Sequence, residues 1–571
     1  MAELTEVKVQ KEHPEVKMPV NKHDGYQMDL DSILKELGHF GKFQLLNCLF
    51  ICITILLFAM YAMSYVFTAG VVNHRCLVPD CDDPSNPEFK PSWLGNAVPY
   101  DWRNSDSSAT KSFEKCERFA RNLTVPREPE CPKTMFSSTF ETCDQWVFED
   151  DTSTIQTEWN LTCEDNEWKL ALIGTINNVG QFVCLTMAGI VSDKFGRRTV
   201  LVFGIVTLGM IGIVKSFSVN YLMFVFLEFF GTVLGTGCYT AGYILGMELV
   251  QPRKRVLGGA VITCFFAFGE ALVGAISWKT RSWRLLLRII HPPALLLLSY
   301  FWLIPESIRW LMVQGRRKEV AKVIKNAART NNVVLSDMAM QKLTPGSNSD
   351  SDETEDDERI RIQTTQSWKS FLKSTPMILR VLNCSFCWFT NAFVFYGLSL
   401  NSVAIAGNKY LNFILVSLIE VPAHVVTYIL SDRLGRRTLL CGALISSGVA
   451  CFASKFVATD LTWLRLVMFL YGKFSITISF AILYVYTTEL FPTSMRHSIL
   501  ASCSMLGRVG SMIAPQTPLL ARYMDSLPLI LFGGTALTSG SLILFFPETL
   551  NIRLPDTIEE AENIGKPEIK T

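Results

Sequence analysis

Twelve runs of mostly apolar residues, each long enough to cross a bilayer as a helix, constrain this chain more than any other feature. A hydrocarbon core about 30 Å thick requires roughly 20 apolar residues per helical span, and backbone polar groups inside it must be satisfied within the helices. We therefore predict an all-α membrane protein with twelve transmembrane helices. The runs cover 43–69, 170–192, 198–216, 220–247, 256–277, 283–304, 378–399, 408–430, 438–457, 463–489, 498–523 and 526–547.

The segment between the first two predicted spans is polar and much longer than the other loops. Val71 to Trp168 hold 19 Asp or Glu against 9 Lys or Arg, with Asn-Leu-Thr glycosylation sequons at Asn122 and Asn160. An even number of cysteines in such a segment is typical of a disulfide-rich domain on the oxidising side of a membrane. We predict a glycosylated extracellular domain over 70–168, with fifteen disulfide pairings open. Its cysteines are Cys76, Cys81, Cys116, Cys131, Cys143 and Cys163.

Basic residues cluster in the short loops on the other side of the predicted membrane. Positive charge in short loops marks the cytoplasmic face, so we expect a plasma-membrane protein with both termini in the cytoplasm. These residues are Lys194, Arg197, Arg198, Arg253, Lys254, Arg255, Arg316, Arg317, Lys318, Arg433, Arg436 and Arg437.

The predicted domain order follows from these spans and loops. The order is a cytoplasmic tail (1–42), the first span (43–69), the extracellular domain (70–168), spans two to six (169–311), a cytoplasmic linker (312–376), spans seven to twelve (377–548) and a cytoplasmic tail (549–571). The linker begins as an amphipathic basic helix. It ends in the acidic, low-complexity run "SNSDSDETEDDE" (347–358), which we predict to be disordered.

The two halves of the chain repeat the same charged motifs. "SDKFGRRTVL" after the second span returns as "SDRLGRRTLL" after the eighth, 239 positions later. "ELVQPRKR" returns as "ELFPTSMR" at an offset of 241, and "PES" at Pro305 returns as "PET" at Pro547 at an offset of 242. Offsets this close indicate a duplicated unit of about 240 residues. We therefore predict two pseudo-symmetric six-helix bundles joined by the linker.

The repeated loops resemble the signature loop of the major facilitator superfamily. Four further stretches, with the large cysteine-bearing first loop, resemble its organic ion branch, solute carrier family 22. These stretches are "PESIRWL" (305–311), "FYGLSLN" (395–401), "NKYLNFILVSLIEVPA" (408–423) and "YTTELFPTSMR" (486–496). The resemblance covers nearly the whole chain outside the tails. It implies alternating access, in which two bundles rock around a central site.

The same loops supply a candidate gate at the cytoplasmic face. A carboxylate can hold a guanidinium against the end of a neighbouring helix, and such pairs can form when the halves meet and separate when they part. The alternative is that the arginines only set the topology. We favour the gate because topology alone does not require Asp, Gly and Arg at fixed positions in both halves. The candidate gating residues are Asp193, Arg197, Glu248, Arg255, Asp432, Arg436, Glu489 and Arg496.

Three ionisable residues fall inside predicted spans, where each costs at least about 2.5–3.5 kcal/mol. We expect Arg508 to bind a substrate carboxylate in bidentate fashion, with an inter-helix salt bridge as the alternative. The family resemblance supports this role, since anion- and carnitine-type members carry Arg at this position and cation-preferring members carry Asp. Glu270 and Glu420 are expected to bind an ammonium group or a coupling cation. The alternatives are an internal ion pair for Glu420, which matches an acidic position of the family, and a pairing of Glu270 with a basic residue such as Arg288.

Aromatic side chains are expected to line the rest of the site. Organic ions present cationic heads and apolar bodies to ring faces. The family motifs favour Trp388, Phe395, Tyr396, Phe480, Tyr486, Tyr239 and Tyr243 for this role.

These features together predict a transporter of small organic ions. One fixed cation and two carboxylates at membrane depth suit a zwitterion or organic cation, such as a carnitine-like or amino-acid-like amine, moved by alternating access. The alternatives are an organic anion exchanger, a polyspecific cation facilitator, and a receptor or adhesion protein without transport. We expect lipid and a small organic ion as partners, Na⁺ or H⁺ as a candidate coupling ion, and a monomer. No enzyme activity, nucleic acid, cofactor or metal is expected, because the chain shows no phosphate-binding loop and no metal-ligand spacing.

Overall fold

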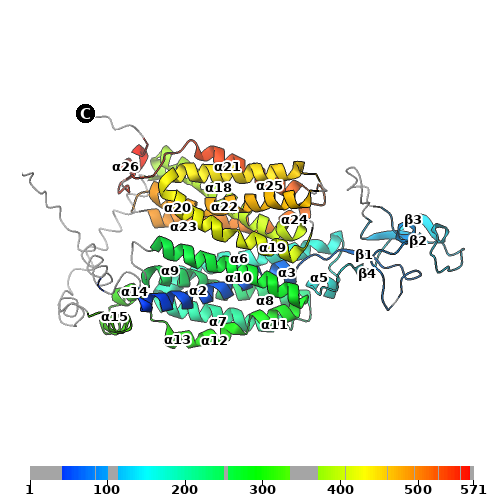
Figure 1. Cartoon of the computed structure of the whole chain (residues 1–571), viewed down its shortest axis with the longest axis horizontal. Helices are drawn as coiled ribbons and strands as arrows, with labels where there is room; N and C mark the ends of the chain where they lie inside the picture. The colour runs from blue at the N-terminus through cyan, green and yellow to red at the C-terminus, as the bar shows by residue number, and fades with distance from the viewer. Residues whose placement is uncertain are drawn as a thin grey trace, which may run out of the picture.

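The computed structural model shows two helical bundles side by side, with a small β-containing domain at one end (Figure 1). It describes residues 36, 41–83, 85–100, 113–249, 255–334, 371–405, 407–458, 461–493, 495–524, 526–552 and 554–565. The acidic run predicted at 347–358 lies outside the described residues. The prediction of a mostly helical membrane protein built from two bundles is confirmed.

The first bundle contains the helices up to α13. Short 3-10 turns connect some of these pieces, such as Leu297–Ser299 between α12 and α13. The helices are α2 (Lys42–Met63), α3 (Tyr65–Thr68), α6 (Glu164–Phe195), α7 (Arg197–Lys215), α8 (Tyr221–Gly235), α9 (Gly237–Leu249), α10 (Arg255–Thr280), α11 (Trp283–Ile290), α12 (Pro293–Leu296) and α13 (Tyr300–Leu303).

The second bundle has the corresponding helices in the same order. Its eleventh predicted span is broken, because α23 is followed by the 3-10 turn Ala514–Gln516 and the short α24 at two prolines. The helices are α18 (Thr375–Asn401), α19 (Lys409–Leu418), α20 (Glu420–Leu434), α21 (Arg436–Phe456), α22 (Thr462–Leu490), α23 (Arg496–Ile513), α24 (Thr517–Leu520) and α25 (Leu527–Ile543).

Ten helical segments of the described chain are long and apolar enough to cross a membrane. The remaining two predicted spans correspond to the broken α23–α24 segment and to α25, an apolar helix of 17 residues. Polar side chains start several of these helices: Asn220 accepts a hydrogen bond from the Met223 amide at 2.8 Å, and Asn408 accepts one from the Tyr410 amide at 3.0 Å. Such caps satisfy amides that the first helical turn leaves free.

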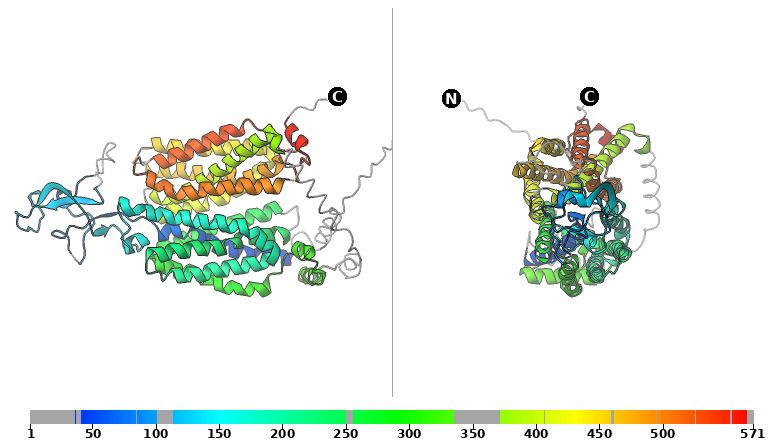
Figure 2. Two further views of the ribbon diagram at one scale, coloured as in Figure 1. Left: turned by 180° about the vertical axis from the view of Figure 1, so that it is seen from behind. Right: turned by 90° about the vertical axis from the view of Figure 1, so that its right-hand side faces the viewer.

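The loop domain, residues 70–163, projects from one end of the bundles (Figure 2). Strand β1 (His74–Cys76) pairs antiparallel with β4 (Trp146–Phe148), and β2 (Glu117–Arg121) pairs antiparallel with β3 (Phe136–Thr142). Short helices α4 (Leu94–Ala97) and α5 (Ile155–Glu158) complete the domain.

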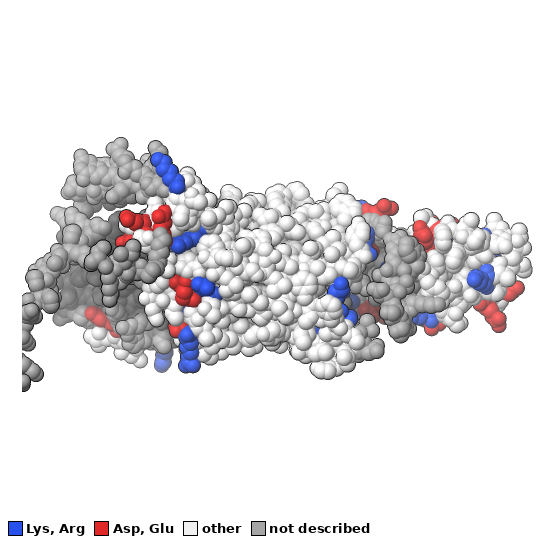
Figure 3. All heavy atoms as spheres, turned by 90° about the horizontal axis from the view of Figure 1, so that it is seen from above, with Lys and Arg blue, Asp and Glu red and all other residues white. Residues whose placement is uncertain are grey.

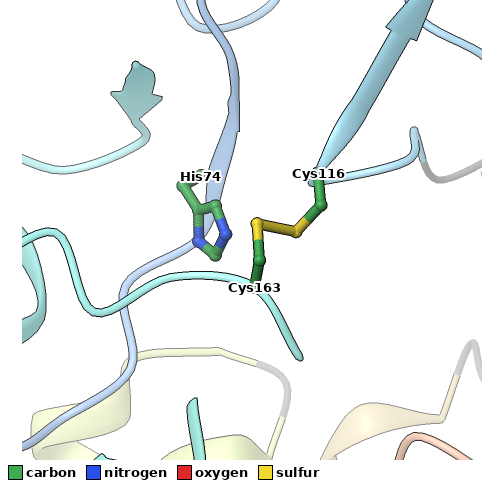
Figure 4. A group of neighbouring side chains, drawn as sticks. All are labelled: His74, Cys116 and Cys163. Carbon is green, nitrogen blue, oxygen red and sulfur yellow. A yellow bond between two sulfur atoms is a disulfide. The ribbon is translucent and has the colours of Figure 1, made fainter. Parts of the chain in front are cut away.

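Three disulfides hold this loop domain together. They join Cys76 to Cys143, Cys81 to Cys131 and Cys116 to Cys163, one of the fifteen pairings that the sequence left open. His74 lies beside the Cys116–Cys163 bond (Figure 4). Since the two sulfur atoms are bonded to each other, this group of three side chains is not a thiolate metal site.

The opposite end of the bundles carries α14 (Ile308–Val313), α15 (Arg317–Asn331) and α26 (Ile558–Asn563). We call the two ends of the bundles the loop-domain end and the linker end. On the face shown in Figure 3, charged side chains gather at these two ends and leave a band of uncharged residues between them. Such a band is typical of a surface that faces lipid.

The two bundles contact each other near the loop-domain end. Helix α6 contacts α23 and α24, and α10 contacts α19 and α20. Thr175 donates a hydrogen bond to the Met512 carbonyl at 3.0 Å and accepts one from the Gln516 amide group at 2.8 Å. The Phe67 ring packs edge-on against Phe413 with 5.0 Å between ring centroids. These contacts close the loop-domain end.

Charge pairs at the rim of this end reinforce the closure. Arg522 of the second bundle donates to the Glu167 carboxylate at the start of α6 through Nε at 3.0 Å. Lys409, at the start of α19, lies 3.3 Å from the carboxylate of Asp150 in the loop domain.

Candidate functional site

Arg508 lies near the middle of the membrane-spanning part of α23. It follows the first residue of that helix by twelve positions, which corresponds to about 18 Å along the axis. Its guanidinium is within hydrogen-bonding reach of Tyr396 on α18 and within electrostatic reach of Tyr484 on α22 and Tyr239 on α9. Since α9 belongs to the first bundle and the other helices to the second, Arg508 faces the boundary between the bundles.

Arg508 has no carboxylate partner among the described residues. The inter-helix salt bridge, which the sequence left as an alternative for this residue, is therefore absent from the described part of the chain. A guanidinium held among tyrosine hydroxyls can still accept a bidentate carboxylate. This is the property expected of a substrate-binding cation.

A cluster of aromatic rings on α18 and α22 lies next to Arg508. Trp388 packs edge-on against Tyr484 with 4.5 Å between centroids and against Phe480 with 5.8 Å. Phe480 stacks on Phe395 at 5.6 Å, and Phe395 contacts Tyr396. Tyr484 keeps 44% of its surface exposed although it has ring and charge neighbours from both bundles. It therefore faces open space between the bundles.

The first bundle contributes two of the predicted tyrosines from α9. Tyr239 stacks with Tyr243 at 6.4 Å and packs against Phe58 at 5.5 Å and Phe266 at 5.9 Å. Both tyrosines interact with Tyr484 across the boundary. The structure thus brings Tyr239, Tyr243 and Tyr396 together around Arg508, with Phe395, Phe480 and Trp388 behind them.

Tyr486 lies elsewhere. Its side chain is fully buried, and its hydroxyl donates a hydrogen bond to the Pro547 carbonyl at 3.0 Å. Pro547 follows α25 at the linker end, so Tyr486 joins α22 to the end of α25. Two residues of helix place Tyr484 and Tyr486 about 200° apart around the axis, and Tyr484, which the sequence analysis did not select, takes the place beside Arg508.

Glu420 pairs with Lys473, which the sequence analysis also missed. The Lys473 ammonium lies 2.8 Å from the Glu420 carboxylate and donates to the Ser399 hydroxyl at 2.7 Å. It also lies 3.2 Å from the centre of the Phe395 ring, a cation–π contact. The internal ion pair considered for Glu420 is therefore present. Lys473 lies eleven residues inside α22 and was detectable by the same criterion as Arg508, an ionisable residue at membrane depth.

Glu270 lies on α10 of the first bundle against this ion pair. Its carboxyl is next to Glu420 and Ser417, and Lys473 is within electrostatic reach. The pairing with Arg288 considered from the sequence is wrong. Arg288 instead stacks on Phe217 at 4.5 Å and donates to the Ser216 hydroxyl at 3.4 Å, beyond the end of α7.

Two matching charge clusters occupy the linker end, one in each bundle. In the first, Arg197 lies 2.8 Å from Asp193 and 3.9 Å from Glu248. The second cluster repeats this geometry. Arg436 lies 3.0 Å from Asp432 and 3.3 Å from Glu489.

All of these ion pairs join residues of the same bundle, as far as the described residues show. Arg496 donates to the Phe491 carbonyl at 3.3 Å, also within its own bundle. Arg255 begins α10, and its side chain lies outside the described residues. The gate between the halves that the sequence predicted is thus not closed by these ion pairs in this structure, and its role remains a prediction.

A glutamate from the repeated Pro-Glu-Ser/Thr motif completes each cluster. Glu548 accepts hydrogen bonds from the first amides of α21, those of Arg436, Arg437 and Thr438, at 2.7, 3.2 and 3.3 Å. Burial alone would raise the pKa of the Glu548 carboxyl, but these amide donors outweigh burial and lower its pKa. Glu306 takes the same position in the first bundle and accepts from the Arg198 amide at 3.1 Å.

The glycine before each capped helix is required by its backbone geometry. Gly196 has φ of +93° and Gly435 has φ of +90°, a region that other residues rarely adopt. A Cβ atom at either position would collide with the capping carboxylate. This explains why both copies of the motif place Gly before the two arginines.

The first bundle also encloses a polar cluster that the sequence analysis did not identify. Lys215 at the end of α7 lies 2.5 Å from Glu228 on α8, and both are buried. Asn177 donates to the other Glu228 oxygen at 2.7 Å. The cluster borders a cavity of about 20 Å³ that also touches His291, enough for about one water molecule.

Comparisons with known proteins agree with this architecture. Residues 134–560 match the family model described as "Sugar (and other) transporter". Mouse "Solute carrier family 22 member 4" is 32% identical over 94% of this chain and 95% of its own length, and human "Organic cation/carnitine transporter 2" is 32% identical over 93% and 94%. A Drosophila melanogaster "Organic cation transporter protein" is 30% identical over 94% and 95%.

Among solved structures, the xylose transporter XylE from E. coli in a partially occluded inward-open conformation is similar to this chain. The TM-score is 0.58 at 16% identity, over 90% of this chain and 100% of that one. At this identity the likeness concerns the fold alone.

Proposed function

Since this chain belongs to solute carrier family 22 of the major facilitator superfamily, we propose that it carries small organic zwitterions, with a cationic head and a carboxylate, by alternating access. It is a multi-pass membrane transporter of a family related to organic cation and carnitine transporters, and it is not an enzyme. The substrate class is the proposal, and it rests on the site around Arg508.

The observation that carries the proposal is the guanidinium of Arg508 without a carboxylate partner among the described residues. An isolated cation at membrane depth is costly, and a substrate carboxylate would compensate it. The flat guanidinium suits bidentate binding of a carboxylate. A substrate anion is therefore the natural partner at this position.

The rings around Arg508 suit the cationic end of the same molecule. A quaternary or protonated amine is attracted to the faces of Tyr and Trp rings, by about 2 kcal/mol or more where water is excluded. Tyr239, Tyr243 and Tyr484 supply rings from both bundles. Glu270 and Glu420, by contrast, are fully buried against Lys473 in this state, so we assign the cationic head to the rings.

Alternating access is supported by the asymmetry between the two ends. The bundles are in contact at the loop-domain end, whereas the arginine clusters at the linker end pair within their own bundles. We infer that the loop-domain end is extracellular, because it carries the disulfides and both sequons, and that both termini are cytoplasmic in the plasma membrane. The structure then represents an inward-facing state, and the arginine clusters form the cytoplasmic gate in the opposite state.

An organic anion exchanger is the second candidate. It is favoured by one observation: Arg508 has no carboxylate partner among the described residues, while both carboxylates of the predicted site are buried against Lys473. Under this alternative the rings bind only the apolar body of the anion.

Uptake measurements on Arg508 variants test the proposal. Cells expressing the full chain are assayed with radiolabelled L-carnitine, tetraethylammonium and glutarate, which represent a zwitterion, a cation and a dianion. Arg508→Ala should weaken L-carnitine binding by roughly 30-fold or more, because removing one partner of a buried charge pair costs about 2–5 kcal/mol. Arg508→Lys should recover only part of the L-carnitine binding, since a lysine ammonium cannot bind the carboxylate in bidentate fashion.

Arg288→Ala is the matched control. Arg288 is also an arginine of a membrane-spanning helix, but it stacks on Phe217 away from the site. L-Carnitine uptake by Arg288→Ala should equal that of the wild type after correction for surface expression. Unchanged L-carnitine uptake by Arg508→Ala would rule out the zwitterion site, whereas glutarate uptake that excludes L-carnitine would favour the anion exchanger.

A further inference from the structure

Glu270, Glu420 and Lys473 form a buried charge cluster across the boundary between the bundles. Glu270 comes from α10 of the first bundle, and the other two come from α20 and α22 of the second. Glu270 and Lys473 have no exposed surface, and 2% of Glu420 is exposed. Glu270 and Lys473 lie ten and eleven residues from the loop-domain ends of α10 and α22. Glu420 begins α20, eleven residues after the first residue of α19, so all three lie about 15 Å along the axis from that end.

The charges of this cluster do not balance when all three groups are ionised. Two carboxylates and one ammonium leave a net charge of −1 on three buried side chains. The ammonium of Lys473 is engaged by Glu420 and by the Ser399 hydroxyl. Neither oxygen of Glu270 has a hydrogen bond of good geometry from the described residues. An isolated buried carboxylate costs several kcal/mol, and two neighbouring carboxylates avoid that cost by holding a proton between them.

A metal cation does not fit the same position. Hard cations in proteins take about six or more oxygen ligands, and this cluster offers two carboxyl groups and the Ser417 hydroxyl. A metal ion there would also lie next to the Lys473 ammonium, which repels it. A proton neutralises the excess charge without further ligands.

We propose that Glu270 and Glu420 share one proton while the bundles are closed at the loop-domain end, and that opening this end releases the proton to water. Glu270 leaves the cluster when the bundles part, because it is the member contributed by the first bundle. Its O–H bond then breaks and water accepts the proton, while Glu420 keeps its ion pair with Lys473. The conformational equilibrium is thereby linked to pH, and where the proposed transport function holds, proton movement is coupled to it.

Three other titratable side chains lie near the cluster, each on a different helix. Cys264 on α10, Tyr65 on α3 and His424 on α20 interact electrostatically with Glu270, Glu420 or Lys473. None of the three is a carboxylate, a lysine or an arginine, so none adds a permanent charge to the cluster. The excess charge therefore belongs to the carboxyl pair itself.

Accessibility of a cysteine at the boundary tests the proposal without any substrate. Ile414 on α19 is partly buried and packs against Gly274 of α10 in the closed state, so opening of the loop-domain end should raise the accessibility of a thiol at Ile414→Cys to a water-soluble reagent. The full chain on intact cells is labelled with a membrane-impermeant methanethiosulfonate at external pH 5.5 to 8.5. Because any thiol reacts faster as it ionises, the measured quantity is the ratio of the rates with native Glu270 and with Glu270→Gln at each pH.

Glu270→Gln imitates the protonated carboxyl and should keep this end closed at every pH. The ratio should therefore rise with pH, by up to about tenfold per pH unit, the limit for one linked proton. A ratio that stays constant over this range would overturn the proposal. External Na⁺ is also replaced by N-methylglucamine at constant pH. A ratio that changes with Na⁺ and not with pH would overturn the proposal in favour of a metal cation.

Glu167→Gln is the matched control. Glu167 is also a carboxylate at the bundle boundary, but it is accessible and paired with Arg522 at the rim. The ratio of the labelling rate with native Glu167 to the rate with Glu167→Gln should not change with pH. A ratio that rises with pH, as expected for Glu270→Gln, would count against the buried cluster. Surface expression and the elution profile in detergent confirm that each variant folds. Since no solute is used, a negative result here is distinct from a failed uptake experiment.

Discussion

Single charged residues inside the bundles carry large energies, and Lys215 shows this outside the proposed site. Its ammonium pairs with Glu228 at 2.5 Å, and Asn177 and Gln181 extend the pair into a hydrogen-bonded chain. Breaking a buried pair by removing one partner costs about 3–5 kcal/mol, whereas replacing both partners can be nearly neutral. The pair therefore holds α7, α8 and α6 in register.

We expect Lys215→Met to lower the thermal stability of the purified protein markedly, because Glu228 stays buried without a cation. The double variant Lys215→Met/Glu228→Gln should recover most of this loss, since Gln still accepts the hydrogen bond from Asn177. The fraction of protein that elutes as a monodisperse peak after heating measures both effects. A double variant no more stable than Lys215→Met would show that the pair is not the cause.

At the residue scale, the sequence predicted the charged positions better than their partners. Arg508, Glu270 and Glu420 stood out because ionisable groups are rare at membrane depth. Their neighbours lie on other helices, such as Lys473 on α22 for Glu420 on α20, and such contacts depend on how the helices rotate about their axes. Tyr486 shows the same limit, because its spacing alone does not tell which face of α22 meets the boundary.

The repeated loops illustrate how short motifs act at the scale of one helix. Glu548 caps α21 with three backbone hydrogen bonds, and Glu306 caps α7 with one. A carboxylate at a helix N-terminus is further stabilised by the helix dipole. The charged decamer and the distant Pro-Glu-Ser/Thr motif are thus two parts of a single structural unit in each bundle.

Glu548→Gln should destabilise the second bundle by about 1–2 kcal/mol at pH 7, because the charge that interacts with the amides and the dipole is lost. Glu306→Gln is the matched control and should cost less, since fewer helix amides depend on it. Thermal unfolding of both variants in detergent measures the difference. An equal loss in both variants would contradict the capping role.

The stability loss caused by Glu548→Gln should depend on pH. The folded pKa of Glu548 lies below its ordinary value of 4.5, so its contribution is present above that value and is lost as the pH falls through the folded pKa. The stability gap between wild type and Glu548→Gln should therefore be full at pH 7 and shrink below about pH 4.5. A gap that stays constant down to pH 3 would mean that the charge is not involved.

The elements themselves were largely predictable from the sequence. Apolar run length gave the spans, because a membrane leaves few alternatives to the helix. The break between α23 and α24 follows from Pro515 and Pro518, which interrupt helical hydrogen bonding. The disulfide pairing was not predictable, since it depends on how β1 to β4 fold.

For the whole molecule, the two-fold repeat predicted the bundles but not the end at which they meet. Motifs that are equivalent in the two halves favour neither state, and the contacts that decide it lie on segments without a repeat signature. The hydrogen bond of 2.8 Å between Gln516 and Thr175 is one of these contacts. Closure at the loop-domain end is therefore a property of the assembled bundles.

Locking this contact should stop the transport cycle. In Thr175→Cys/Gln516→Cys, oxidation with copper phenanthroline should join the bundles and abolish uptake of whichever solute in the panel the wild type carries, because the loop-domain end can no longer open. Reduction should restore uptake. The control pair Ser374→Cys/Glu562→Cys joins the start of α18 to α26 at the linker end, where these side chains are hydrogen-bonded. Its cross-link does not connect the two bundles and should leave uptake unchanged. Uptake that persists in fully cross-linked Thr175→Cys/Gln516→Cys protein would show that this end does not open during transport.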